Sequence, residues 1–462
     1  MSDKPVPTAA VDLLNRKAFL DGLRHHITDL ASVPLDDLPA PRVLAVDASW
    51  GTGKTWVAKE LLRQLTTEDA SGATLIDAFR YDHHADPFAV IAAAMIEVLA
   101  PQHETRMVLV KAATPVLKVA APIAIKWVLD AALDYVGLDV KELLDKVNLK
   151  REALDDSVDA FSDKSVDRLF ESYSSTEKAQ SHFIQTLSSV TGQRDKPFVV
   201  IIDELDRCRP TFSLEVLERL KHLFTAEKVV FVLFWNKASL HESIRHTYGP
   251  NTNSETYLDK FVALTIPLPV AESRFGRAPR RTRYESFIDH TIRTKYQGLA
   301  PSTDYMKELL GELSELYDAS VRDIDRVLHH IRLLAFNTST VQYDMQVYLL
   351  FLLVKNSQQF ALVCNLDPAA FGEEHERLSR YPADHQGGAL SYISAAFKYM
   401  SRLDHYKGLH KAINANTAVL PDSEQDFARE HHSSRTDTMV RLAVQFVQEQ
   451  RSVRQVQKRT TP

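Results

Sequence analysis

A glycine-rich turn between an expected strand and an expected helix constrains this chain more than any other feature. The turn, residues 50–55, follows the apolar run at 43–46 and leads into a helix predicted over 56–65. Such a turn directs several backbone N–H groups toward one point at the positive end of a helix dipole. Its glycines let the backbone approach an anion without a Cβ atom in the way. We call residues 50–55 the phosphate loop, because the pattern predicts a site for polyphosphate.

Side chains of the phosphate loop have separate predicted roles. Lys54 can reach the β- and γ-phosphates of a nucleotide, and the Thr55 hydroxyl is placed to hold Mg²⁺. The usual pattern is G-x-x-x-x-G-K-[ST], and this chain has Ala48 in place of the first glycine. The phosphate-contacting half of the pattern is intact. The predicted nucleotide-binding residues are Trp50, Gly51, Thr52, Gly53, Lys54, Thr55 and Trp56.

An acidic pair much later in the chain completes the predicted site. Residues 197–202 are an apolar, β-branched run typical of a buried parallel strand, and Asp203 and Glu204 follow it. Nucleoside triphosphatases hold Mg²⁺ with a carboxylate at the carboxyl end of a core strand beside a phosphate loop. We therefore predict that Asp203 binds the metal through water. Glu204 is predicted to polarise the attacking water as general base.

Asn236 is the third predicted catalytic residue, with Lys54 and Glu204. It ends the strand expected at 229–234, a neighbour of the metal strand in this class of sheet. A polar side chain at that position can orient the attacking water or sense the γ-phosphate. An ordinary asparagine in a turn is the open alternative.

The remaining pattern alternates strands with helices. This alternation predicts an α/β fold whose core is a five-stranded parallel sheet with helices on both faces. The expected strands are 42–47, 74–78, 197–202, 229–234 and 261–266.

The expected domain limits follow from the same pattern. Residues 1–283 form the core, with a helical insertion at about 100–170. An all-helical domain is predicted over 284–448, and a polar, basic tail over 449–462 is expected to be disordered.

Composition limits the partners and the compartment. The net charge of −6 argues against a broadly basic surface for nucleic acid. Two cysteines, Cys208 and Cys364, are too few for a disulfide framework or a thiolate metal site, and they suit a reducing cytoplasm. The segment 107–138 is apolar, but Lys111, Lys118, Lys126 and Asp130 interrupt it. We therefore expect an amphipathic helix or hairpin there and no membrane span.

Several segments together resemble the KAP family of P-loop NTPases, which is related to the AAA and STAND ATPases. The acidic block D-E-L-D-R-C is the most specific match, and Phe79 stands where the family usually has tryptophan. The resemblance covers about residues 10–335. The matching segments are Trp50–Thr55, Phe79–Asp82, Asp203–Cys208, Tyr257–Lys260, Pro267–Pro269 and Arg322–Arg326.

The resemblance implies a function. It implies Mg²⁺-dependent ATP hydrolysis coupled to assembly or signalling, in bacteria often within phage-defence or exclusion systems. Many members carry paired transmembrane helices between the phosphate loop and the metal strand. Here that position holds the lysine-interrupted segment 107–138, so the chain resembles a soluble member.

Two other functions stay open. One is a nucleotide-binding scaffold that hydrolyses little ATP. It would fit two features: Ala48 stands in place of the first glycine of the pattern, and no arginine is securely placed at the γ-phosphate. A small-molecule or nucleotide kinase shares the phosphate loop, but it usually lacks a metal strand that ends in Asp-Glu.

Arginines outside the loop bear on assembly. An ATPase of this class gains most from an arginine donated across a subunit interface, so we expect a slow isolated chain that self-association or a partner accelerates. Arg245 and the basic segment 274–283 are candidate donors of that arginine. Arg207 could serve a neighbouring subunit or form a structural ion pair. Arg322 and Arg326 share one helix face, which could meet the γ-phosphate after domain closure or be solvated. The basic segment could also bind nucleic acid or an anionic partner, or could be a solvated loop.

Overall fold

The computed structural model divides the chain into two compact units. The sheet unit comprises Met1–Asp12 and Arg16–Val270, and the helical unit comprises Leu13–Asn15 and Ala271–Pro462. The residues that the structure describes are 11–34, 41–69, 71–83, 87–100, 103–120, 165–223, 225–269, 284–296, 304–334, 340–380 and 389–401.

A five-stranded sheet forms the centre of the sheet unit. Its order is β2-β3-β4-β1-β5, and every neighbouring pair is parallel, which confirms the predicted fold class. All residues of β3 and β4 are buried, as their uninterrupted apolar sequences predict. The strands are β1 (Val43–Asp47), β2 (Ala73–Asp77), β3 (Phe198–Asp203), β4 (Val229–Trp235) and β5 (Leu264–Pro267).

The last strand begins later than predicted, at Leu264 instead of residue 261. The backbone N–H groups of Asp259, Lys260 and Phe261 donate to carbonyls of the preceding helix α10 (Ser254–Leu258). These residues therefore close the end of a helix and cannot pair with β1.

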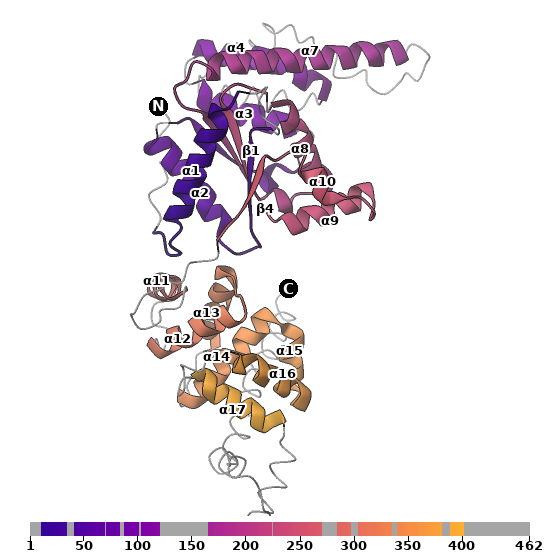
Figure 1. The fold of residues 1–462 in the computed structure, drawn as a ribbon. Coiled ribbons are helices and arrows are strands. Elements are labelled where there is room, and N and C mark those ends of the chain that lie inside the picture. Colours follow the sequence, from indigo (N-terminus) through magenta and orange to yellow (C-terminus); the bar gives the residue numbers. More distant parts are fainter. Residues whose placement is uncertain are drawn as a thin grey trace, which may run out of the picture. The chain divides into compact units, whose positions relative to one another are not determined.

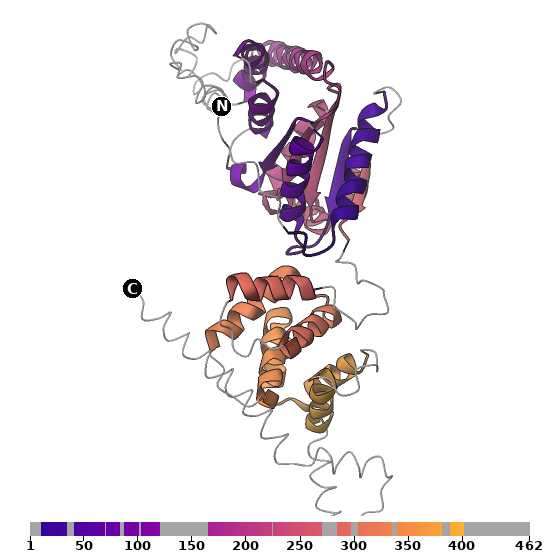
Figure 2. The same ribbon diagram turned by 90° about the vertical axis from the view of Figure 1, so that its left-hand side faces the viewer.

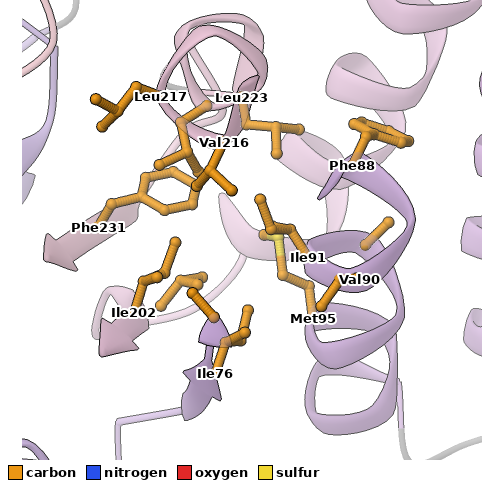
Figure 3. Close-up of a cluster of buried hydrophobic side chains, with 14 of the residues drawn as sticks. Ile76, Phe88, Val90, Ile91, Met95, Ile202, Val216, Leu217, Leu223 and Phe231 are labelled. Carbon is orange, nitrogen blue, oxygen red and sulfur yellow. The ribbon is translucent and has the colours of Figure 1, made fainter. Parts of the chain in front are cut away.

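Helices cover both faces of the sheet (Figure 1). On one face, α1 (Lys17–Ser32) and α2 (Lys54–Thr67) pack against alternate side chains of β1, β3 and β4. The opposite face packs against α3 (Pro87–Leu99) and α8 (Pro210–Leu223). Figure 3 shows Ile76, Ile202 and Phe231 of the strands directed toward side chains of these two helices.

The predicted helical insertion is described in part. α4 (His103–Ala120) packs along α7 (Ser165–Thr191), and both views show the two helices side by side (Figures 1 and 2). Residues 121–164, which include most of the lysine-interrupted segment, lie outside the described residues. Over the part of the chain that is described, no helix has the length and apolarity needed to cross a bilayer.

The described part of the helical unit consists of helices around one apolar core, in which Phe351, Phe360, Phe371 and Phe397 are fully buried. The predicted limits of this domain, 284 and 448, stay predictions, and the predicted tail lies outside the described residues. The helices are α11 (Glu285–Lys295), α12 (Asp304–Leu316), α13 (Val321–Leu334), α14 (Thr340–Lys355), α15 (Ser357–Cys364), α16 (Pro368–Ser379) and α17 (Ala389–Ser401).

Candidate functional site

The phosphate loop and the acidic pair meet at one edge of the sheet. β4 lies between β1 and β3, and the carboxyl ends of parallel strands share an edge. Two hydrogen bonds join the ends of β1 and β4: Ala48 N–H donates to the Trp235 carbonyl at 3.1 Å, and Lys237 N–H donates to Asp47 Oδ1 at 2.7 Å. On its other side β4 pairs with β3. The segments that follow β1, β3 and β4 therefore converge.

The backbone of the phosphate loop has the conformation that its glycines predict. Gly51 and Gly53 have φ values of 81° and 93°, a left-handed region that favours glycine. Gly53 is the N-cap of α2, so the loop opens directly onto a helix N-terminus. These are the features of an anion-binding turn.

The side chain of Arg16 contacts the backbone of the phosphate loop. It is 3% exposed, and its Nη2 donates to the Thr52 carbonyl at 2.6 Å. A Cβ added to Gly53 would stand 3.4 Å from Arg16 Nη1, so side chain and loop backbone are in close contact. No pattern in the sequence predicts this contact, and its one signal is an arginine within an otherwise amphipathic N-terminal segment.

Lys54 lies inside the loop. Its Nζ donates to the carbonyls of Ala48 at 2.7 Å and Ser49 at 3.3 Å, and the residue is 9% exposed. Burial lowers the pKa of Lys54, and the negative charges of Asp206 and Asp203 oppose that shift. The ammonium group is therefore held between the loop carbonyls and the acidic segment.

The acidic pair faces Thr55. Asp203 is 3% exposed; burial raises the pKa of its carboxyl, and a hydrogen bond from Thr55 opposes that shift. Thr55 Oγ1 is also 3.5 Å from Glu204 Oε1. Glu204 adopts a left-handed backbone conformation, with φ of 61°. The structure thus brings together the two predicted magnesium ligands and the predicted base.

Arg207 forms an ion pair with that predicted base. Its Nη1 is 2.9 Å from Glu204 Oε2. Burial raises the pKa of Glu204, while the Arg207 guanidinium acts in the opposite direction. Of the readings that the sequence left open for Arg207, this contact favours an ion pair within the chain.

The other predicted site residues differ in surroundings. Asn236 is half-buried at the carboxyl end of β4, and its side chain makes no hydrogen bond to any described residue. Trp50 is 51% exposed, and its Nε1 donates to Asp206 Oδ2 at 2.5 Å. Trp56 is partly buried and packs against the core beneath α1 and α2, which gives it a packing role as well.

The structure describes only some of the arginines that could act on a γ-phosphate. Arg245 pairs with Glu242 at 2.8 Å and is exposed. Arg322 and Arg326 are exposed on α13 of the helical unit. The basic segment 274–283 lies outside the described residues.

The donor set fits a polyphosphate with a hard divalent cation. The Thr55 hydroxyl and the Asp203 carboxylate supply oxygen, which Mg²⁺ prefers. Within the described ranges, no group of three or more His, Cys, Asp or Glu side chains could hold a metal alone. Mg²⁺ at sites of this kind takes several of its ligands from phosphates and water.

Comparison with known proteins agrees with this architecture. The chain is similar to the phage T7 exclusion protein of Escherichia coli (strain K12), with 20% identity over 299 residues. The match covers 64% of this chain and 38% of that protein, so the chain spans well under half of the relative's length. The model of the KAP family P-loop domain matches residues 25–336, more than half of the 462 residues. This chain therefore belongs to the KAP family of P-loop proteins.

Proposed function

We propose that this protein binds ATP with Mg²⁺ and hydrolyses it to drive a conformational or assembly switch. The observation that carries the proposal is the convergence of Lys54, Thr55, Asp203 and Glu204 at one edge of the sheet. Thr55 links the loop to both carboxylates, so phosphate-binding, metal-binding and proton-accepting groups face the same point.

Each group has a role that follows from its chemistry. The loop N–H groups and Lys54 would hold the phosphates, while the Thr55 hydroxyl would hold Mg²⁺ directly and the Asp203 carboxylate would hold it through water. The cation, when bound, neutralises charge on the β- and γ-phosphate oxygens. Glu204 accepts the proton of the attacking water, and the burial that raises the pKa of its carboxyl makes it a better base. Asn236 orients that water from β4.

The relative suggests a biological setting. A phage exclusion protein is 20% identical to this chain over 299 residues, and we propose a role in antiviral defence inside the cytoplasm. The switch acts on a further protein or on other copies of this chain. Isolated chains are then slow ATPases, and the specific activity rises with protein concentration or with the partner.

The second candidate function is that of a nucleotide-binding scaffold that hydrolyses little ATP. Two observations favour it: Ala48 replaces the first glycine of the motif, and Arg207 neutralises Glu204 at 2.9 Å. A base held in an ion pair accepts a proton less readily. In this reading ATP binding alone sets the conformation.

Phosphate release without an added acceptor separates the candidates. Purified protein is incubated with Mg·ATP over a range of protein concentrations, and ATP binding is measured in parallel. Steady release of phosphate supports hydrolysis, and tight binding without turnover supports the scaffold. Turnover that requires a small-molecule acceptor would instead indicate a kinase. A flat specific activity with a monomeric mass in ATP would contradict activation by self-association.

A further inference from the structure

Within the described part of the chain, the hydrogen bonds between the phosphate loop and the acidic segment all come from side chains. β1 and β3 share no hydrogen bonds, because β4 lies between them. Thr55 makes one connection, to Asp203 and Glu204. Trp50 makes the other, to Asp206 in the short helix η4 (Leu205–Arg207). The second connection joins residues 156 positions apart in sequence, and the proposed hydrolysis gives it no role.

The carboxylate that receives Trp50 is buried and firmly held. Asp206 is 6% exposed, and its Oδ1 has no hydrogen-bond partner among the described residues. Its backbone carbonyl accepts from Ser239 Oγ at 3.2 Å, and the Leu205 carbonyl accepts from Ser213 Oγ at 2.9 Å. Hydroxyls from α8 and from α9 (Lys237–Tyr248) therefore fix η4 from two sides. A buried charge in a fixed place is a strong anchor for one N–H donor.

At the phosphate-loop end of this connection, the Trp50 ring is held by a hydrogen bond and not by packing. The Trp50 ring is 51% exposed, so core packing does not account for its position. The 2.5 Å contact between Nε1 and Asp206 Oδ2 orients it instead. The Asp206 charge also acts on Lys54, where it opposes the effect of burial more strongly than Asp203 does. One carboxylate thus acts on the loop at two points.

We propose that the Trp50–Asp206 hydrogen bond is a tether that holds the phosphate loop in register with the acidic pair. Asp206 is then a positioning residue, which lets Thr55 and Asp203 act on one magnesium ion. The inference rests on the proposed binding of Mg·ATP. It predicts a specific defect: without the tether, phosphate binding by the loop persists, but magnesium no longer strengthens it as much.

Four variants test the tether through ATP affinity, measured by calorimetry with Mg²⁺ and again with EDTA. They are Trp50→Phe, Asp206→Ala, the double variant, and Asp195→Ala as an exposed carboxylate control at the amino end of β3. Each tether variant should lose about tenfold of the magnesium-dependent gain in affinity, measured as the ratio of the affinity with Mg²⁺ to the affinity with EDTA in the same variant. The double variant should lose no more than either single variant, because both remove the same interaction.

The indole N–H resonances give a second readout that a general structural role would not reproduce. The resonance that disappears in Trp50→Phe is that of the Trp50 indole N–H. In the wild type it should lie downfield, because this N–H donates a hydrogen bond to a carboxylate. Asp206→Ala should move it upfield, and Asp206→Asn, which keeps a neutral acceptor, should place it between. Far-UV circular dichroism establishes that each variant is folded.

The outcomes are separable from those of the proposed function. Wild-type protein that binds no ATP contradicts the proposed function, and the indole resonances then decide alone whether the tether forms. Wild-type binding with unaltered magnesium dependence in Trp50→Phe overturns the tether. Additive losses in the double variant overturn it as well, since Asp206 would then act independently of Trp50.

Discussion

The two units bury polar groups in opposite ways. In the sheet unit, Lys54, Asp203 and Asp206 lie at the ends of strands and helices, at one edge of the sheet. In the helical unit, the Tyr317 and Tyr348 hydroxyls are 2.6 Å apart, and both donate to the same carboxylate oxygen of Glu374. Each arrangement leaves one carboxylate oxygen without a hydrogen-bond partner among the described residues: Asp206 Oδ1 in the first, and Glu374 Oε1 in the second, where Arg377 Nε lies 3.9 Å away.

This difference separates a binding edge from a structural centre. Tyr348 packs edge-on against Phe397 with centroids 5.1 Å apart, and Arg377 lies over the Tyr317 ring at 5.0 Å. Burial raises the pKa of both tyrosines, so their hydroxyls stay protonated and donate to Glu374. A buried network in which two hydroxyls donate to one carboxylate contributes to stability, whereas buried charge beside the phosphate loop is placed to act on a ligand.

The largest effect is expected at the centre of the helical unit. Glu374→Ala removes a fully buried acceptor and leaves two buried hydroxyls without it, which should lower the free energy of unfolding by about 3–5 kcal/mol. Urea unfolding measures this change, with Glu376→Ala as an exposed control on the same helix. ATP affinity of the folded protein should not change. A Glu374 variant as stable as wild type would show that the network is not structural.

Lys54→Ala tests the sheet unit. Removing the ammonium group from the phosphate loop should weaken ATP binding about 100-fold, with little change in unfolding free energy. Titration calorimetry gives the affinity, and Lys221→Ala provides an exposed lysine for comparison. If Lys54→Ala bound ATP normally but unfolded more easily, the buried charge at this edge would be structural after all.

The pH dependence of stability gives a smaller effect, again in the helical unit. Glu312 on α12 is 3% exposed, and burial raises the pKa of its carboxyl to about 7 from an ordinary 4.5, with Glu308 and Glu315 adding to the shift. Between these values the folded state keeps a proton that the unfolded state has lost. Stability should therefore fall as pH rises from about 4.5 to 7 and then level off.

Glu312→Gln should remove most of that slope and be more stable than wild type above pH 7 by about 2 kcal/mol. Urea unfolding at pH 5 and pH 8 measures both quantities. Equal slopes in variant and wild type would show that another group titrates in this window.

Patterns that are local in sequence predicted the fold and the components of the site. The apolar runs of β3 and β4 identify buried strands, and the glycines of the phosphate loop identify its left-handed turns. The start of β5 was predicted three residues too early, because Phe261, Val262 and Ala263 extend its apolar run. Hydrogen bonds from residues 259–261 to α10 show that the helix end reaches Phe261.

The sequence predicted that the phosphate loop meets the acidic pair, but other contacts between distant residues could not be predicted from it. Arg16 and Thr52 lie 36 positions apart, and Trp50 and Asp206 lie 156 apart. No periodicity or spacing links such pairs, since the sheet order brings them together. The same holds for Tyr317 and Glu374, 57 positions apart in the helical unit. The sequence named Trp50 as a nucleotide-binding residue, but only the structure gives it Asp206 as a partner.

A single-turnover measurement of phosphate release tests the central claim most directly, with Glu204→Gln as the decisive variant. Protein in excess over radiolabelled Mg·ATP is sampled over time, and ATP affinity is determined separately for wild type and variant. We predict equal affinities within about threefold, release of phosphate by wild type, and release at least about 100-fold slower in the variant, because the amide keeps the shape of Glu204 without its basicity. Phosphate release by Glu204→Gln at the wild-type rate would contradict the assignment of this edge as the hydrolytic site.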